Sequence, residues 1–297
     1  MEKPMKCNRE QVTSLQDWFS RPVTENKNDS VQCAWVGQAG FLFRGNGLKI
    51  GIDLYLSDSL AQKYQGKEFP HQRMMEVPIR SEELEDLDVV LCTHGHTDHM
   101  DKETLVSLYR QGTGPLLIAP RFELPKLLEM GLPSQRLIGM SEYETFTLSE
   151  RLSIQALPAA HETRQYDQWG NTKALGFLLD FGLLSFYHSG DTLAFTELEA
   201  AAAAAHVDVC MLPVNGRKDS LSQKGILGNF SPTEAGLFAH QVGASFLIPH
   251  HFGMFDFNTV DPEEIKHQVE AQGWEYGKTY VLPHINTVYT FTKQRSL

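Results

Sequence analysis

The sequence predicts an α/β protein in which two β-sheets pack face to face between outer helices, a four-layer αββα sandwich. Two observations lead to this prediction. The chain divides into two halves rich in short apolar runs, and each half also contains segments with helical periodicity. With 297 residues, 41% of them hydrophobic, the chain can bury a sizeable core. Periodicity alone leaves other layered α/β arrangements open.

The segment before the first expected strand has a different character. Residues Asn8 to Ser20 have a helical pattern with apolar residues on one face, and the polar stretch Thr24 to Ser30 follows. We therefore expect residues 1–30 to form a leader helix and linker, packed outside the domain or on a partner subunit. Residues 31–297 are expected to form a single domain.

The strands of the first half are short apolar runs. Glycine-containing turns at residues 37–40 and 45–47 separate the first three runs, as in β-hairpins. The connection from Leu54 to Arg80 is long and rich in cationic and hydrogen-bonding residues, which is typical of a functional or mobile loop. The expected strands are Val31–Val36, Phe41–Phe43, Leu48–Asp53, Asp88–Cys92, Leu116–Ile118, Arg136–Gly139, Glu144–Leu148 and Leu152–Leu157.

The second half repeats this organisation. Ser231 to Glu234 is a capping box with proline at the first helical position, so a helix should run from there to Val242. A second helix should span Ala194 to Ala205, which is rich in alanine. The last two expected strands should close the second sheet. The expected strands of this half are Ala174–Phe181, Leu184–His188, Val207–Leu212, Phe246–Ile248, Lys278–Leu282 and Thr287–Phe291.

Composition limits the classes of function. The net charge of -11 argues against a broad nucleic-acid surface, and an anionic substrate would need dedicated arginine or lysine residues. The stretch Met1 to Glu10 is polar, and no apolar run has membrane length, so we expect a soluble, cytoplasmic protein with no membrane partner. The cysteines are widely spread and are expected to be free thiols: Cys7, Cys33, Cys92 and Cys210.

Three histidines and an aspartate fall within six positions, directly after the apolar run Asp88–Cys92. In an extended segment, residues two apart point the same way, so His94 and His96 can hold one ion while Asp98 and His99 turn toward another. Several imidazoles crowded together repel one another when protonated and need partners when buried and neutral. The cluster therefore indicates a metal site.

Further candidate ligands lie alone at the ends of expected strands. His161, Asp191 and His251 each follow such a strand, so all three side chains can converge on one edge of the sandwich. Imidazole nitrogen and carboxylate oxygen suit Zn²⁺, Mn²⁺ or Fe²⁺. Asp53 also ends a strand, where backbone N–H groups can satisfy its carboxylate.

The cluster matches the His-x-His-x-Asp-His motif, so the chain resembles the metallo-β-lactamase-fold hydrolases. The resemblance implies the αββα fold and two divalent ions, Mn²⁺ or Zn²⁺, with Fe²⁺ as a further option. It also implies that Asp191 bridges the ions and that Asp53 supports the metal loop. The implied ligands are His94, His96 and His161 for the first ion, and Asp98, His99 and His251 for the second.

Flanking sequences narrow the resemblance. The stretches Trp35–Phe41, Tyr187–Thr192 and Ile248–Gly253 look like the branch that includes L-ascorbate-6-phosphate lactonase. One departure is His161, because the lactonase lacks a histidine at that motif. The histidine favours a full two-metal site and leaves the identity of the substrate open.

The expected activity is hydrolysis of a lactone or related ester of a small, anionic metabolite, by attack of a metal-bound hydroxide. Asp98 would orient the nucleophile, and His188 would act as an acid for the leaving group, a substrate contact or a partner that supports the metal ligands. The alternatives are a phosphodiesterase or nuclease with the same ions, or a non-catalytic metal-binding protein. A homo-oligomer is compatible with the leader helix. The residues expected to hold a phosphate or carboxylate are Arg73, Asn215 and Arg217.

Overall fold

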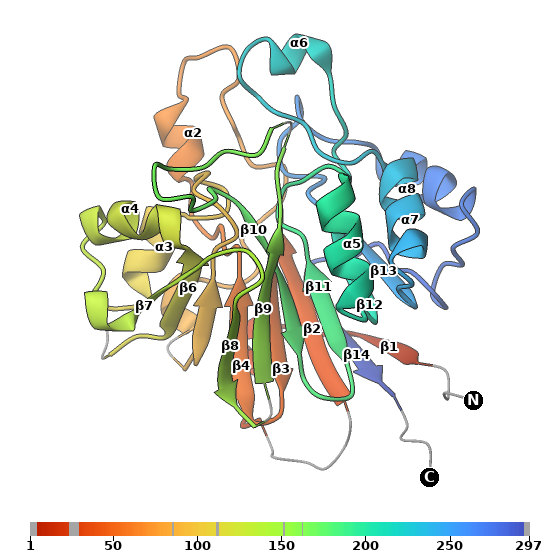
Figure 1. Cartoon of the computed structure of the whole chain (residues 1–297), viewed down its shortest axis with the longest axis horizontal. Coiled ribbons are helices and arrows are strands. Elements are labelled where there is room, and N and C mark those ends of the chain that lie inside the picture. Colours follow the sequence, from red (N-terminus) through yellow and green to blue (C-terminus); the bar gives the residue numbers. More distant parts are fainter. Residues whose placement is uncertain are drawn as a thin grey trace.

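The computed structural model describes residues 5–293, except 24–29, 85, 111–112, 151 and 162. It confirms the αββα sandwich (Figure 1). The first sheet has eight strands, in spatial order β1 (Lys6–Gln11), β14 (Thr287–Thr292), β2 (Ser30–Gly37), β3 (Gly40–Gly45), β4 (Leu48–Ile52), β5 (Val89–Leu91), β6 (Leu116–Pro120) and β7 (Leu137–Met140).

The second sheet has six strands. Within it, β11 pairs antiparallel with β10 and parallel with β12. In spatial order the strands are β13 (Phe246–His250), β12 (Val209–Pro213), β11 (Ser185–His188), β10 (Leu175–Asp180), β9 (Leu152–Pro158) and β8 (Thr145–Ser149).

Alternation along the strands explains why the first sheet is covered on both faces. Cys33 and Trp35 of β2 belong to the large core shared with the second sheet, whereas Ala34 and Val36 belong to a separate core under the helices. Successive side chains of a strand point to opposite faces, so one strand contributes to both cores. Nearly continuous apolar strands are therefore what this layer requires.

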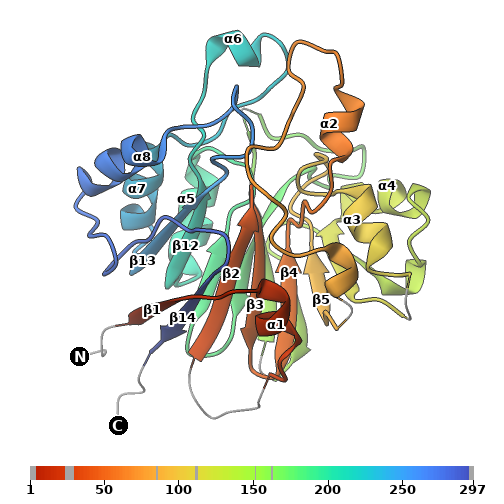
Figure 2. The ribbon, with the colours of Figure 1, turned by 180° about the vertical axis from the view of Figure 1, so that it is seen from behind.

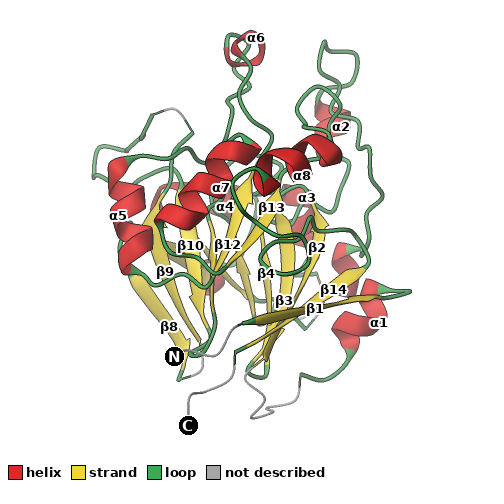
Figure 3. Cartoon of the chain, turned by 90° about the vertical axis from the view of Figure 1, so that its right-hand side faces the viewer, coloured by secondary structure: helices red, strands yellow, loops and turns green. Residues whose placement is uncertain are grey.

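Helices cover the outer face of each sheet (Figures 1 and 2). Buried residues of α1, α3 and α4 join the core of the first sheet, and those of α5, α7 and α8 join the core of the second. Figure 3 shows α2 and α6 at one end of the sandwich, within long loops. The helices are α1 (Leu15–Ser20), α2 (Ser59–Lys63), α3 (Lys102–Ser107), α4 (Leu124–Glu129), α5 (Thr196–Ala204), α6 (Asp219–Ser222), α7 (Pro232–Gln241) and α8 (Pro262–Glu270).

The leader differs from its prediction. Its first part is the strand β1, which pairs antiparallel with β14, and only Leu15 to Ser20 are helical. Five of the six β1 side chains are exposed. The segment therefore lacks the alternation of apolar and polar residues by which a strand with one buried face is predicted. Trp18 and Phe19 are buried in the core of the first sheet, so this part of the leader packs into the domain. Residues 1–4 and 24–29, which include most of the expected linker, lie outside the described residues.

The last strand was assigned to the wrong sheet. β14 lies between β1 and β2 in the first sheet, with Val288 opposite Ala34, rather than closing the second sheet. The stretch Lys278 to Leu282 forms isolated bridges instead of a strand. Strand pairing over such sequence distances depends on contacts between the layers, which periodicity does not encode.

Other expectations from composition can be compared with the structure. Cys33, Cys92 and Cys210 are buried free thiols, and Cys7 is a half-buried free thiol. Among the residues that the structure describes, no helix combines the length and apolar character needed to cross a lipid bilayer.

Replacing Trp18 with alanine tests whether the leader stabilises the domain. Trp18 is 3% exposed, and its indole N–H donates to Gln32. We expect Trp18→Ala to lower the free energy of unfolding by about 3–5 kcal/mol, measured by urea denaturation. Leu237→Ala, at a side chain that is 52% exposed, is the control and should change it by less than about 0.5 kcal/mol. Equal effects of the two substitutions would contradict this role of the leader.

Candidate metal centre

Seven predicted ligand side chains, carried by loops after separate strands, come together at one end of the sandwich. Their ligand atoms form two groups, and within each group these atoms all lie within 4.8 Å of one another. The first group is His94, His96, His161 and Asp191, and the second is Asp98, His99 and His251.

Asp191 connects the two groups. Its Oδ2 atom lies 3.7 Å from His161 Nε2 in the first group. The same atom lies 3.4 Å from His99 Nε2 and 3.3 Å from His251 Nε2 in the second group. One carboxylate therefore faces both groups, which is compatible with the bridging role that the resemblance implies for Asp191.

The spacing of these atoms fits a bound cation. Nitrogen and oxygen ligands about 2.0–2.2 Å from one ion in a tetrahedral arrangement lie about 3.3–3.6 Å apart. In the second group, Asp98 Oδ2 lies 3.8 Å from His99 Nε2 and 3.6 Å from His251 Nε2. Together with the separations from Asp191, these values are close to those expected around a single ion.

Unpartnered atoms give a second test of the fit. Buried polar atoms are normally hydrogen-bonded. Among the described residues, the Nε2 atoms of His94, His99 and His161 and the Oδ1 atom of Asp191 are buried and make no hydrogen bond. These unpartnered atoms are distributed over both ligand groups and are of the types that bind divalent ions, so the residues fit the predicted metals.

The protein surroundings alone give the histidines different protonation states. Burial, followed by repulsion from neighbouring histidines, lowers the pKa of His94 well below its usual value. Burial and the nearby His161 lower the pKa of His96 to about 4. Burial opposes protonation of His251 as well, but Asp191 and Asp98 outweigh it and raise its pKa to about 9. Binding a cation at His251 near neutral pH would therefore release a proton.

Asp53 fixes the orientation of two candidate ligands. Its Oδ1 accepts the backbone N–H of Thr93 at 2.7 Å, and its Oδ2 accepts the Thr93 hydroxyl at 2.6 Å and His99 Nδ1–H at 2.7 Å. Because that hydroxyl donates to Asp53, it is an acceptor for His94 Nδ1–H at 3.1 Å. These contacts hold the Nδ1 protons and direct both Nε2 atoms toward the centre.

Gly95 lies between His94 and His96 for a steric reason. A Cβ atom at this position would lie 2.5 Å from the carboxyl carbon of Glu123. The Glu123 carboxyl therefore packs directly against the backbone of the metal loop. Lys126 holds the same segment from the side, because its ammonium group donates to the Gly95 carbonyl.

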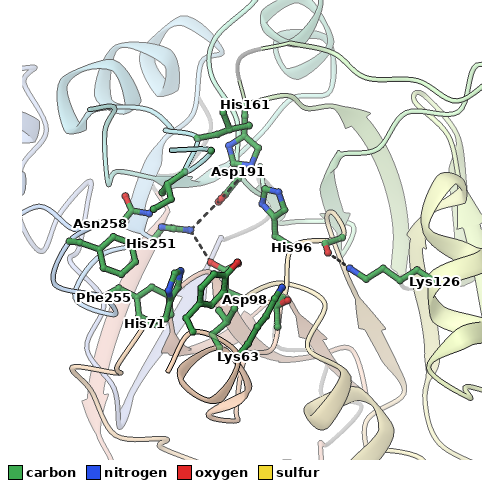
Figure 4. Close-up of a pocket in the computed structure, with 18 residues that line it drawn as sticks. Lys63, His71, His96, Asp98, Lys126, His161, Asp191, His251, Phe255 and Asn258 are labelled. Carbon is green, nitrogen blue, oxygen red and sulfur yellow. Dashed lines mark hydrogen bonds and ion pairs between the residues drawn. The ribbon is translucent and has the colours of Figure 1, made fainter. Parts of the chain in front are cut away.

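The candidate ligands border an open cavity of about 260 Å³ (Figure 4). His96, Asp98, His161, Asp191 and His251 contribute to its wall. The remaining wall combines two lysines, at the end of α2 and in α4, with aromatic residues of the long loops; its chief residues are Lys63, Tyr64, His71, Lys126, Phe255 and Phe257. A second cavity of about 240 Å³ shares His96, Lys126 and His161 with the first.

His188 does not have the position that a catalytic acid needs. It is fully buried, its Nε2–H donates to the Ala39 carbonyl at 2.8 Å, and its Nδ1 accepts the Gly190 N–H at 3.1 Å. Both ring nitrogens are thus engaged with backbone, which favours the supporting role among those expected for His188. His250 stacks on His188 with the ring centroids 4.6 Å apart, whereas His251 faces the cavity.

The three residues that were expected to contact the substrate do not line this cavity. Arg73 donates to the Tyr55 carbonyl, and Arg217 pairs with Glu234. The Asn215 amide donates to Asn258, which does line the cavity. Their own polar partners explain these positions, and a direct contact with substrate remains a prediction for them.

Sequence reasoning did not identify Gln38 or Lys126 as site residues, and it placed Lys63 only among the cationic residues of the Leu54–Arg80 connection, which was expected to be functional or mobile. Gln38 Nε2 lies 2.8 Å from Asp98 Oδ2, and the two lysines line the cavity. Gln38 follows Gly37 directly after an apolar run, which was the available signal. Lys126 had no comparable signal, because a lysine on a short helix is usually solvent-exposed.

Comparisons with known proteins agree with this architecture. A family model described as the beta-lactamase superfamily domain matches residues 61–252. A UPF0173 metal-dependent hydrolase of Pyrobaculum islandicum is 25% identical over 243 residues, which are 81% of this chain and 92% of the relative. Another from Thermoplasma acidophilum is 26% identical over 260 residues, covering 86% of this chain and 97% of the relative.

A solved structure is similar in fold. Igni18, described as a metallo hydrolase from Ignicoccus hospitalis, has a TM-score of 0.63 and 21% sequence identity. The match covers 88% of this chain and 98% of the other. At this identity the similarity concerns the fold alone.

Asp53→Asn tests the orientation of His99. The substitution replaces one carboxylate oxygen with an amide group that cannot accept every present hydrogen bond, so the His99 ring loses its fixed position. We expect the affinity for Mn²⁺ or Zn²⁺ to fall about 10- to 100-fold, measured by competition with a chelator. Asp17→Asn, on the exposed side of α1, is the control and should retain the wild-type affinity. Unchanged affinity in Asp53→Asn would refute this role.

Gly95→Ala tests the contact with Glu123. The added methyl group would meet the carboxylate, so we expect a loss of about 1–3 kcal/mol in the free energy of unfolding. Glu123→Ala in the same chain creates space, and the double variant should recover part of that loss. Urea denaturation of both single variants and the double variant measures the coupling. Strictly additive effects would mean that the two residues do not interact in this way.

Proposed function

The chain belongs to the beta-lactamase superfamily, and on this premise we propose that it is a metal-dependent hydrolase. The observation that supports this proposal most directly is the pair of ligand groups facing Asp191 at the wall of an open cavity. His94, His96 and His161 would hold one ion, and Asp98, His99 and His251 the other. Divalent ions bound there would supply Lewis acidity and lower the pKa of water.

The other groups on the wall have separate roles in this proposal. Asp98 lines the cavity, where its carboxylate can accept a hydrogen bond from an attacking water and orient it. Aromatic side chains on one side exclude water from the reacting group. Leu60, Phe255 and Met254 form a small apolar cluster with Tyr55, which holds this side of the cavity in place.

We propose a lactone or related ester of a small, anionic metabolite as the substrate. The chain carries a net charge of -11, yet Lys63 and Lys126 both line the cavity. Cations placed there favour a carboxylate or phosphate group on the substrate. The likeness of Trp35–Phe41 and Tyr187–Thr192 to the ascorbate-6-phosphate lactonase branch supports the lactone, within this proposal.

A substrate panel tests the reaction. Metal-free protein should be inactive, and Mn²⁺ or Zn²⁺ should restore hydrolysis of sugar-phosphate lactones, followed in a pH-stat. We expect His161→Ala to lower kcat/KM at least about 100-fold, since it removes a candidate ligand. His267→Ala, on the exposed side of α8, is the matched control and should retain full activity. Hydrolysis of bis(p-nitrophenyl) phosphate but of no lactone or ester would show that the reaction is phosphodiester cleavage.

Neutral and anionic lactones of similar size test the role of the cavity lysine. Lys126→Met should raise KM for the anionic lactone about tenfold and leave the neutral lactone nearly unchanged, because only the anion uses the charge. Lys266→Met, on α8, should affect neither. Equal loss for both substrates would assign Lys126 to support of the Gly95 loop instead of charge recognition.

A further inference from the structure

The turn between β2 and β3 holds a polar side chain against the second ligand group. Gln38 is 2% exposed, and its backbone φ of 51° lies in the left-handed region. Such a conformation is unfavourable for a residue other than glycine and persists only where surrounding contacts impose it.

Two of those contacts involve the Gln38 carbonyl. It accepts the backbone N–H of His251 at 2.9 Å and the indole N–H of Trp35 at 2.9 Å. The first of these bonds ties the turn to a candidate ligand in the other sheet. The Gln38 backbone is therefore fixed relative to the metal centre before its side chain is considered.

The amide end of Gln38 lies among the candidate ligand atoms. Its Nε2 position is 2.8 Å from Asp98 Oδ2 and 3.1 Å from His251 Nε2. Adjacent ligands of a five- or six-coordinate ion, at bond lengths of about 2.1 Å, lie about 3.0 Å apart. The end of the amide thus has the spacing of an additional ligand.

Electrostatics determines which end of the amide can occupy that position. An N–H group there can donate to Asp98 as long as the carboxylate lone pair is available. A cation shared by Asp98 and His251 would take the lone pairs of both residues and repel the positive end of the N–H dipole. The carbonyl oxygen would be attracted instead, and a half-turn of the planar amide exchanges the two ends at nearly the same positions.

The oxygen is free to make this exchange. Gln38 Oε1 accepts no hydrogen bond from the described residues, so rotating the side-chain amide by half a turn breaks only the contacts of Nε2. No backbone movement is needed, since the carbonyl contacts with His251 and Trp35 are independent of the amide orientation.

We propose that Gln38 Oε1 is a further ligand of the ion held by Asp98, His99 and His251. This assignment rests on the metal pair of the proposed function. It makes the two ions unequal, because no amide side chain of the described residues is bonded to the group of His94, His96 and His161. A neutral carbonyl oxygen favours cations that accept oxygen ligands and a higher coordination number, such as Mn²⁺, at this position.

Metal titration of the full-length, metal-free protein tests the assignment without a substrate. Calorimetry with Mn²⁺ and with Zn²⁺ should resolve two binding events in the wild type. In Gln38→Leu, which keeps the size but removes the amide, we expect one event to weaken about 10- to 100-fold and the other to stay unchanged. In Gln38→Glu, which retains an oxygen at this position, the same event should be at least as tight as in the wild type.

Gln32→Leu is the matched control, because Gln32 lies in β2, just before the turn that holds Gln38, and its amide contacts Trp18 and Thr290 instead of the metal centre. It should retain both affinities. If Gln38→Leu also retains both, or if both events weaken equally in Gln38→Leu and Gln38→Glu, Gln38 is a scaffold residue and the assignment is wrong. If the wild-type protein binds no ion, both the proposed function and the assignment of Gln38 as a ligand are wrong.

Discussion

The buried carboxylate of Asp53 is the contact on which the metal centre depends. A buried carboxylate is costly unless donors surround it, and Thr93 and His99 supply three hydrogen bonds. Those donors belong to the loop that follows β5, while Asp53 follows β4, so one side chain joins two neighbouring strand ends. His99 and, through Thr93, His94 receive their ring orientation from this group. The remaining ligands are brought to a centre whose geometry is already fixed on one side.

The second sheet completes that centre. His161 follows β9, Asp191 follows β11 and His251 follows β13, so three ligands depend on how the two sheets pack. The core of aromatic and aliphatic residues between the sheets therefore also sets the distances among the ligand atoms. An ion that binds residues of both sheets stabilises their association, because it binds the folded state preferentially. Layer packing and metal affinity are thus coupled in this fold.

Hydrophobic periodicity and turn residues are local signals, so they predicted two β-rich halves with helices, and the resemblance to the metallo-β-lactamase fold selected the αββα layers among the possible arrangements. The sequence also predicted which polar side chains follow strands, and the structure brings those residues together; their roles as ligands stay predictions. The pairing of β14 with β2 and the exposed strand β1 were not predictable from periodicity, since they depend on distant partners. Gln38 and Lys126 were missed for the same reason: each gains its significance only from atoms contributed by another part of the chain. His188 has the residue type of an acid, but its backbone hydrogen bonds give it a supporting role.

The position of β1 at the end of the first sheet has a consequence for solubility. An edge strand presents free backbone groups to which another chain can add, and such addition leads to aggregation. β1 carries Lys6, Arg9 and Glu10, whose charges oppose the approach of a flat apolar strand. Arg9 is also engaged with Tyr276, which ties this edge to the neighbouring loop. Lateral polymerisation of the sheet is disfavoured at this edge by residues that take no part in the metal centre.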